Sequence, residues 1–327
     1  MTHPEITRHV YPAKLSEQQD LIRLWRSEWS RTDYDWIESL HGDYSETLRI
    51  VSLIARVDGQ PVATATVSFA DRSPEVCLLG NVVTLKPFRR QGIAVTLTNA
   101  AVACGFEAGC KVAYLGSTQM QGNVYERSGF ERLAGCIMCR SAEGHSRCES
   151  EWFDAGQSTI IRPAVWGDMP GLVSLLTQPL QSTVIDYSRG LMSVRYADPV
   201  RCVSAFAVVH DHTQQCGGVM HILASQDGSR VFGLGTMTPD PAPARVHRAV
   251  IDVATHDDYH DQMDDMLSYL KHEAEQRGIE QLWACAAAGD TLKTSALARA
   301  GFQRISVIPA HFQLRSGTED GVILESK

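Results

Sequence analysis

A short basic run with a glycine carries the best-defined chemistry in this chain. It reads Phe88-Arg89-Arg90-Gln91-Gly92-Ile93-Ala94 and lies between an apolar stretch at 82–85 and a helix-like stretch at 95–108. A helix N-terminus has unpaired backbone N–H groups and a partial positive charge, so a turn that opens a helix suits an anion. The small residues of the run allow bridging phosphates to approach the backbone, and its two arginines add positive charge. The run therefore predicts a diphosphate-binding turn.

The elements around this turn must place it at the start of a helix. Apolar residues recur at intervals of three and four from Ile93 to Ala108, and Gly109 follows as a plausible stop. Beyond it, residues 112–115 predict a buried strand, and residues 124–128 predict a second helix before Gly129-Phe130. The resulting order of strand, basic turn, helix, strand and helix predicts an α/β domain.

This segment resembles the GNAT superfamily of acyl-CoA-dependent N-acetyltransferases over residues 78–140. In that family the pattern Arg/Gln-x-x-Gly-x-Gly/Ala binds the CoA pyrophosphate, and Arg89, Gly92 and Ala94 match it. A Tyr-x-x-x-Gly-Phe run often supplies a tyrosine that faces the CoA sulfur, and Tyr125 matches that position. The resemblance implies acetyl-CoA as co-substrate, held by Val82, Val83, Thr84, Arg89, Arg90, Gln91, Gly92, Ile93, Ala94, Ser117, Asn123 and Tyr125.

The resemblance also implies a mechanism. The strand before the turn would separate from its neighbour and offer backbone amides to the pantetheine and the acetyl oxygen, and Tyr125 would donate a proton or hydrogen bond to the departing thiolate. A packed helix tyrosine is the alternative reading of Tyr125. Many relatives carry a glutamate near positions 80 and 81, but residues 76–87 contain no carboxylate. The proton acceptor is therefore expected to be a water held by Asn81 or Ser117, or one of His41, Asp33 and Asp43.

Residues 25–44 correspond in position to the acceptor-binding helices of the family. This segment is rich in aromatic residues with interleaved carboxylates, which suit a cationic amine. The candidate substrate-binding residues are Trp29, Asp33, Tyr34 and Trp36. The alternative is ordinary packing of two amphipathic helices, because Trp25 and Trp29 lie four residues apart on one face.

The chain is long enough for two domains, with 327 residues. The second half repeats the order of elements of the first, so we expect two tandem GNAT-like domains at 1–150 and 151–327, each a mostly antiparallel mixed sheet flanked by helices. Matching Gly278 to Gly109 places Asp258 and Asp261 where the first copy has Arg89 and Gly92. Carboxylates there would repel a diphosphate by about 1 kcal/mol per close pair in water. The second copy is therefore predicted to be structural or substrate-shaping, with a second site for another ligand as the alternative.

Composition narrows the remaining possibilities. The net charge is −8 and no basic stripe follows a helix, so nucleic-acid binding is not expected.

No apolar run approaches the roughly 20 residues of a membrane span and the N-terminus is no signal peptide, so a cytoplasmic protein is expected. The nine cysteines lack a tight ligand spacing, and Cys136 and Cys139 would point to opposite faces of a strand, so no metal is expected. A monomer and a homodimer both remain open.

Together these features predict transfer of an acetyl group from acetyl-CoA to a primary amine of a small molecule, such as an amino acid, a polyamine or an amine-bearing antibiotic. One alternative acceptor is a protein or peptide amine. Another alternative is a CoA-binding sensor or scaffold without turnover, which the missing strand glutamate would explain.

Overall fold

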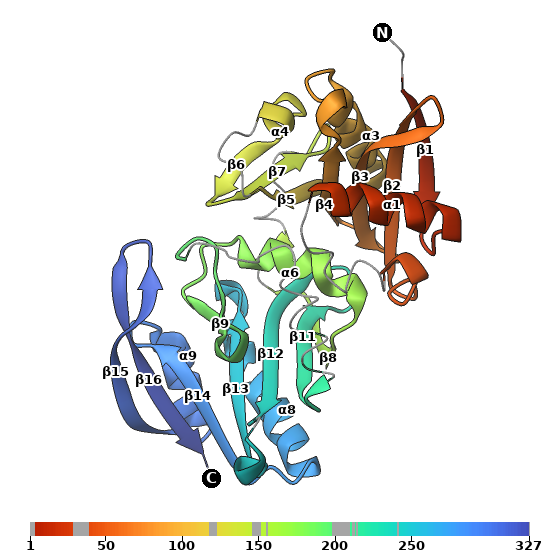
Figure 1. Ribbon diagram of the computed structural model, residues 1–327. Coiled ribbons are helices and arrows are strands. Elements are labelled where there is room, and N and C mark those ends of the chain that lie inside the picture. The colour runs from red at the N-terminus through yellow and green to blue at the C-terminus, as the bar shows by residue number, and fades with distance from the viewer. Residues whose placement is uncertain are drawn as a thin grey trace. The chain divides into compact units, whose positions relative to one another are not determined.

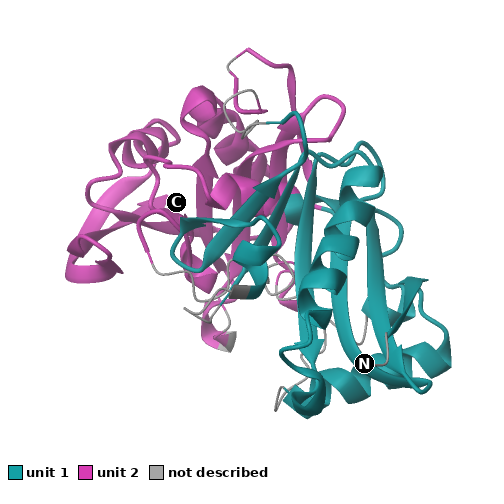
Figure 2. Cartoon of the chain, turned by 90° about the horizontal axis from the view of Figure 1, so that it is seen from above, with its two compact units in different colours: residues 1–148, 165–170 teal, residues 149–164, 171–327 magenta. Residues whose placement is uncertain are grey.

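The chain forms two compact units in the computed structural model, which describes residues 4–28, 39–117, 123–145, 152–154, 156–197, 210, 213, 215–240 and 242–326. The first unit comprises Met1–Cys148 and Val165–Pro170, and the second comprises Glu149–Ala164 and Gly171–Lys327. Figure 2 shows the first unit in teal and the second in magenta. Within the described ranges, none of the helices combines the length and apolar character that a membrane crossing requires.

The first unit is built on a seven-stranded sheet whose order is β1-β2-β3-β4-β5-β7-β6 (Figure 1). All neighbouring strands are antiparallel except β4 and β5, which are parallel. The strands are β1 (Glu5–Val10), β2 (Leu48–Val57), β3 (Gln60–Ala70), β4 (Val76–Thr84), β5 (Val112–Gly116), β6 (Glu131–Ala134) and β7 (Ile137–Ser141). The helical elements are α1 (Leu15–Glu28), η1 (Lys86–Phe88), α3 (Ile93–Glu107) and α4 (Asn123–Arg127).

Alternating apolar residues bury both faces of this sheet. On β2, Ile50 and Ile54 pack with α1, whereas Val51 and Leu53 pack with α3. Successive strand side chains point to opposite faces, so a strand covered on both sides must be apolar at nearly every position. The helices contribute their own apolar stripes, and the two therefore cover opposite faces of the sheet (Figure 1).

A β-bulge interrupts β4 in its middle. Thr66 pairs with Gly80 but Thr64 pairs with Val83, so one residue of β3 faces two of β4. Asn81 lies at this point with φ +50°, a left-handed conformation that asparagine tolerates better than most residues. The extra residue reverses the alternation of the strand: Leu79 packs on the α3 side before the bulge, and Val83 packs on the α1 side after it.

The second unit has the same topology. Its seven-stranded sheet has the order β8-β11-β12-β13-β14-β16-β15, with β13 and β14 as the parallel neighbours. The strands are β8 (Thr159–Pro163), β11 (Val219–Ser225), β12 (Val231–Pro239), β13 (Arg248–Thr255), β14 (Gln281–Ala287), β15 (Gln303–Leu314) and β16 (Gly317–Ser326). The predicted fold class, two mixed and mostly antiparallel sheets with flanking helices, is confirmed.

Helices and short elements complete the second unit. Its main helices are α8 (Met263–Gln276) and α9 (Thr291–Arg299), which follow β13 and β14 as α3 and α4 follow β4 and β5. The short helix α6 (Met169–Leu176) crosses from the first unit into the second. The remaining elements are η2 (Trp166–Asp168), β9 (Val184–Asp186), η3 (Tyr187–Arg189), β10 (Leu191–Met192), η4 (Pro243–Arg245) and η5 (Asp257–Gln262).

Candidate active site

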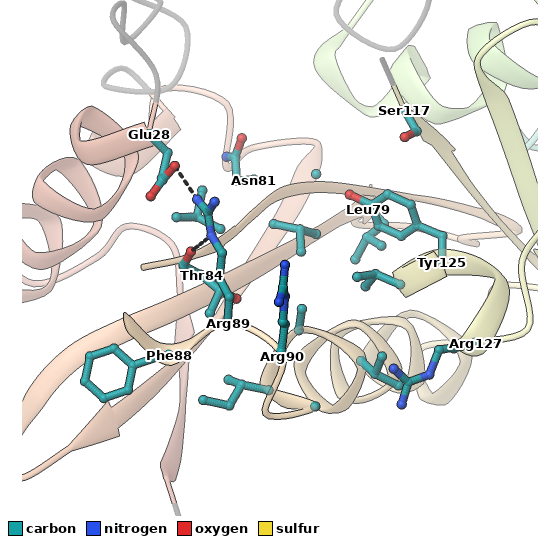
Figure 3. A pocket seen from close by; sticks show the side chains of 18 of the residues that line it. Glu28, Leu79, Asn81, Thr84, Phe88, Arg89, Arg90, Ser117, Tyr125 and Arg127 are labelled. Carbon is teal, nitrogen blue, oxygen red and sulfur yellow. Dashed lines mark hydrogen bonds and ion pairs between the residues drawn. The ribbon is translucent and has the colours of Figure 1, made fainter. Parts of the chain in front are cut away.

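A pocket of about 700 Å³ opens in the first unit where β4 and β5 separate. The two strands pair only from Val76 to Leu78 on β4. Beyond that point they diverge, and the turn after β4, the start of α3 and the helix α4 surround the gap (Figure 3). The lining residues are Glu28, Leu79, Gly80, Asn81, Val82, Val83, Thr84, Phe88, Arg89, Arg90, Gly92, Ile93, Ala94, Val95, Gly116, Ser117, Val124, Tyr125 and Arg127.

The start of α3 provides an anion-binding end of the pocket. Gly92 is the N-cap residue with φ +81°, and no side chain caps the helix. The first helical hydrogen bond runs from the Thr96 N–H to the Gly92 carbonyl, so the N–H groups of residues 93–95 precede it. Residues 92–95 all line the pocket. These N–H groups and the helix dipole favour a phosphate at this position.

The charged side chains of the lining are mostly cationic. They are Arg89, Arg90 and Arg127, against one carboxylate, Glu28, among the described lining residues. Formal charge here is therefore positive although the whole chain carries −8. A positive pocket on an acidic protein attracts an anionic ligand to this place rather than to the surface in general.

Arg89 is already engaged. Its Nη2 lies 2.5 Å from Glu28 Oε2, and its Nε donates to the Thr84 carbonyl at 2.9 Å. Figure 3 shows this guanidinium turned toward Glu28, whereas Arg90 extends into the hollow. Arg90 has φ +63° and makes no ion pair within the part of the chain that the structure describes. Of the two arginines of the turn, Arg89 is therefore held by an internal ion pair, whereas Arg90 is not.

Tyr125 projects from α4 into the pocket (Figure 3). Its ring packs against the core and meets Phe130 edge to face, with ring centroids 6.3 Å apart. Burial raises the pKa of Tyr125 above its ordinary value near 10. The hydroxyl is therefore protonated at neutral pH and can donate a hydrogen bond or a proton.

The structure brings most of the predicted cofactor and catalytic residues together. Those that line the pocket are Asn81, Val82, Val83, Thr84, Arg89, Arg90, Gly92, Ile93, Ala94, Ser117 and Tyr125. Gln91 is directed elsewhere, because its Nε2 donates to the Pro87 carbonyl at 3.2 Å and stabilises the turn. Asn123 begins α4, and its side chain lies outside what the structure describes.

The predicted acceptor residues are mostly outside the described part of the chain. Trp29, Asp33, Tyr34 and Trp36 all fall in the undescribed range 29–38. His41 is exposed on a helical turn and is not among the pocket residues, and Asp43 is likewise exposed.

Glu28 and Arg127 line the pocket but were not predicted from the sequence. Arg127 lies in the Tyr-x-x-x-Gly-Phe run itself, two residues after the tyrosine, and this proximity was the available signal. Glu28 is 61 residues from Arg89 in the sequence, so only the tertiary fold brings the two together. As for metals, the described ranges contain no group of three or more His, Cys, Asp or Glu residues able to hold an ion.

The equivalent region of the second unit keeps the short parallel pairing of its central strands but differs from the first unit at the bulge and at the start of the following helix. The β12 and β13 register runs without a break from Gly233–Thr255 to Pro239–Ala249, so the strand has no bulge. A buried ion pair of 2.7 Å joins Asp252 on β13 to Lys293 on α9. Lys293 Nζ also donates to the Val184 carbonyl of β9. Polar groups of the unit itself therefore connect β13, α9 and β9 in this region.

The turn before α8 is held by contacts of its own residue Tyr259 with the rest of the second unit. Tyr259 in η5 is buried, stacks on Phe232 with ring centroids 4.2 Å apart, and donates to the Asp154 carbonyl at 2.7 Å. Met263 opens α8 as Ile93 opens α3, one residue from the register expected from the sequence. The N-cap residue is Gln262 in a right-handed conformation, not a left-handed glycine.

The family model that matches this chain covers part of the first unit. Residues 16–130 match the profile of the Acetyltransferase (GNAT) family. This match confirms the resemblance predicted from the motif residues. No curated protein matches the sequence.

Similar solved structures share 12–16% identity with this chain, and three of them serve as examples. The ribosomal-protein-alanine N-acetyltransferase from Brucella melitensis has 16% identity and a TM-score of 0.42, covering 51% of this chain and 98% of its own. A GNAT superfamily phosphinothricin acetyltransferase from Sinorhizobium meliloti, in complex with acetyl-CoA, has 13% identity and a TM-score of 0.44, covering 51% and 87%. An acetyltransferase of the GNAT family from Streptococcus pneumoniae has 14% identity and a TM-score of 0.41, covering 52% and 98%.

Proposed function

Because residues 16–130 form a domain of the GNAT acetyltransferase family, we propose that this protein transfers an acetyl group from acetyl-CoA to a primary amine of a small molecule. The observation that carries the proposal is the pocket of the first unit. It combines an uncapped helix N-terminus, three arginines, a pair of separated parallel strands and an inward-pointing tyrosine. These are the groups that an anionic acyl thioester and its leaving thiolate require.

The residues divide between binding and chemistry. The N–H groups at the start of α3, together with Arg90, would hold the diphosphate. The second half of β4, from Asn81 to Thr84, has no parallel partner after the strands separate. Its backbone groups would therefore be available to hold the pantetheine chain and to polarise the thioester carbonyl.

Direct transfer needs a free amine and a protonated leaving group. The amine nitrogen bonds to the carbonyl carbon while the carbon–sulfur bond breaks, and the Tyr125 hydroxyl donates its proton to the sulfur. The nitrogen, positively charged after the attack, then releases its surplus proton to solvent, and a proton from solvent restores the tyrosine hydroxyl. A water held by Asn81 or Ser117 would accept the proton that the ammonium must lose. Holding both reactants in the same pocket supplies the proximity that makes this attack effective.

Glu28 is the carboxylate of the pocket that could be considered as the proton acceptor. However, its 2.5 Å ion pair with Arg89 occupies it. The structure therefore offers no unengaged carboxylate among the described lining residues, and the water-mediated route is the one that we propose. The aromatic and acidic residues Trp29, Asp33, Tyr34 and Trp36 remain our proposed contacts for a cationic acceptor.

We further propose that catalysis belongs to residues 1–150 and that residues 151–327 form a copy without an acetyl-CoA site. The proposal is supported by the unbroken β13, the Asp252–Lys293 ion pair and the packed Tyr259. Each replaces a feature of the first pocket with a contact internal to the second unit. The second unit would then serve a structural or substrate-shaping role.

The test is to incubate the protein with acetyl-CoA and a panel of primary amines while following the release of free CoA thiol. The panel would contain amino acids, polyamines, amine-bearing antibiotics and short peptides with free N-termini. Thiol release that depends on a small amine and yields its N-acetyl derivative by mass spectrometry supports the proposal. Release with peptides alone would change the acceptor class. Binding of acetyl-CoA without release under any amine would favour a sensor.

A further inference from the structure

A second pocket, of about 230 Å³, lies within the second unit. The end of β8, the start of β11 and the C-terminal end of α8 surround it. It is separate from the Asp252–Lys293 pair and from Tyr259, none of which is among its described lining residues. Sites for drug-sized ligands measure roughly 300–1,000 Å³, so this pocket suits a smaller molecule, of about amino-acid size.

His221 on β11 lines this pocket and is buried with an unpartnered ring nitrogen. The residue is 5% exposed, and its Nδ1 atom has no hydrogen-bond partner within the described part of the chain. Its ring lies beside Tyr269 of α8, with ring centroids 6.2 Å apart. Buried polar atoms are normally hydrogen-bonded, and one without a partner costs free energy. The unpartnered nitrogen therefore points to a polar ligand in the pocket.

The first unit has a core leucine where the second unit has His221. The strand pairings place Leu53 of β2 and His221 of β11 at equivalent positions, opposite Ala65 and Gly235 respectively. Leu53 is 4% exposed and packs in the core on the α3 side of its sheet. The fold thus does not require a histidine at this position, and leucine would serve core packing better.

Glu273 and Arg277 bring charges of both signs to the same pocket. Arg277 Nε and Nη2 each lie 3.3 Å from Oε2 of Glu273, and Nη1 donates to the Gly217 carbonyl at 2.7 Å. Three of the five guanidinium N–H donors are therefore used, and Oε1 of Glu273 has no partner among the described residues. Two donors and one carboxylate oxygen remain for a ligand.

The imidazole of His221 is neutral at neutral pH. Burial lowers its pKa below the ordinary value of 6.5, Glu273 partly opposes this shift and Arg277 adds to it. A neutral imidazole has one acceptor nitrogen, so Nδ1 can accept a hydrogen bond from an ammonium group. An anion alone would face the carboxylate of Glu273, and a cation alone would face Arg277. A ligand that carries both charges gives each group a partner.

We propose that this pocket binds a free α-amino acid with a small aliphatic side chain. The ammonium group would donate to His221 Nδ1 and to Glu273, and the carboxylate would accept from Arg277. The apolar lining residues Pro163 and Val219 would contact the side chain. The site is distinct from the acetyl-CoA pocket, and it does not depend on the proposed function.

The experiment is a calorimetric titration of the full chain with L-valine, isobutylamine and isovalerate. Isobutylamine lacks the carboxylate of valine, and isovalerate lacks its amine. The variants are Arg277→Gln and His221→Leu, which introduces the residue of the equivalent position in the first unit. Arg299→Gln is the matched control, because Arg299 also pairs with a carboxylate of α8, Asp264, but does not line the pocket. Thermal unfolding of each protein checks the fold.

We expect wild-type protein to bind L-valine about tenfold more tightly than either analogue, the scale of one hydrogen bond to a charged group. His221→Leu should weaken L-valine by at least about tenfold without lowering the melting temperature, because leucine replaces an unpartnered polar group. Arg277→Gln should bring the affinities for L-valine and isobutylamine within about threefold of each other, and the control should bind L-valine within about threefold of wild type.

The inference is overturned if L-valine does not bind at millimolar concentration, since the pocket would then hold only water. It is also overturned if His221→Leu binds L-valine as tightly as wild type, because the amino acid would then occupy another site. Equal affinity of wild-type protein for L-valine and isobutylamine would contradict a ligand with both charges. None of these outcomes bears on acetyl transfer, which is followed separately by thiol release.

Discussion

Tyr125 and Leu297 occupy the same position in the two units. The Tyr125 carbonyl accepts from the Phe130 N–H at 3.0 Å, and the Leu297 carbonyl accepts from the Phe302 N–H at 2.9 Å. In both units a left-handed glycine, Gly129 or Gly301, separates the helix from the phenylalanine. The backbone of this motif is therefore retained in the second unit, while the hydroxyl that could protonate a thiolate is replaced by a buried aliphatic side chain.

Replacing Tyr125 by phenylalanine should lower kcat about 10²-fold, the lower end of the usual contribution of a general acid. The affinity for acetyl-CoA should change little, because the ring still packs against the core. Steady-state kinetics with calorimetry separates the two effects. Tyr269→Phe, on the exposed face of α8, is the matched control and should leave kcat unchanged. Wild-type kcat in Tyr125→Phe would remove this residue from the chemistry.

The pH dependence of kcat follows from the raised pKa of Tyr125. Burial favours the neutral phenol, so the hydroxyl keeps its proton beyond its ordinary value near 10. We therefore expect no loss of kcat from tyrosine ionisation below pH 10, and any decline above it should disappear in Tyr125→Phe. A decline centred between pH 7 and 9 that Tyr125→Phe abolishes would contradict this assignment.

Gly92→Asp should abolish binding of CoA. The φ of +81° strains any side chain, and a carboxylate at the N-terminus of α3 would repel the diphosphate. Gly278→Asp is the matched control, because Gly278 also has positive φ (+69°) and open space around its Cβ position but lies outside the pocket. Calorimetry should show binding in the control and none in Gly92→Asp. Equal CoA affinity in the two variants would show that the α3 start is not the diphosphate site.

The role of the bulge at Asn81 in cofactor binding can be tested by introducing the residue type found at the equivalent position of the second unit. The parallel register places Val253 on the unbroken β13 where Asn81 lies on β4. Asn81→Val should disfavour the left-handed conformation at φ +50° and weaken acetyl-CoA binding about tenfold, because valine strains this region by about 1–2 kcal/mol. Asn81→Gly should retain the bulge and the affinity. An equal loss of affinity in the glycine and valine variants would mean that the amide side chain, not the bulge, matters for binding.

The buried pair in the second unit predicts a pH-dependent stability. Burial raises the pKa of Asp252 to about 7, above its ordinary value of 3.8, even though Lys293 opposes the shift. The folded state thus binds the proton more tightly than the unfolded state, and this contribution to stability is lost as pH rises from about 4 to 7. Lys293→Met removes the counter-ion of Asp252. The variant should therefore lose more folding stability than the wild-type protein as pH rises over this range.

In unfolding experiments Lys293→Met should destabilise the protein by about 3–5 kcal/mol at pH 8, where it leaves an unpaired buried carboxylate, and by less at pH 5. Adding Asp252→Asn should restore most of the stability and remove the difference between the two pH values. A Lys293→Met variant that is equally destabilised at both pH values would contradict the account of Asp252.

The features predicted from sequence are those fixed by local patterns. The helix that opens at Gly92 and the repeated Gly-Phe motif follow from spacing alone, and both occur in the structure. The acidic turn near Asp258 was predicted within one residue, because Gly109 and Gly278 end their helices with matching hydrogen bonds. In each case a glycine with positive φ marks the end or start of an element.

Other features depend on contacts between distant residues. The bulge at Asn81 is visible only in the pairing of β3 with β4, and nothing in the strand sequence requires it. Glu28 reaches Arg89 through the packing of α1 on the sheet. The sequence likewise showed that the turn before α8 is acidic. It did not show that Tyr259 stacks on Phe232 or that Lys293 forms a buried ion pair with Asp252.

The central claim is that the start of α3 in the first unit holds the diphosphate of acetyl-CoA. The most direct measurement is a crystal structure of the protein soaked with acetyl-CoA. We predict ligand density against the N–H groups of residues 93–95, continuing between Asn81 on β4 and Ser117 toward Tyr125. Density between β13 and β14 of the second unit, or none in either unit at saturating ligand, would contradict the account.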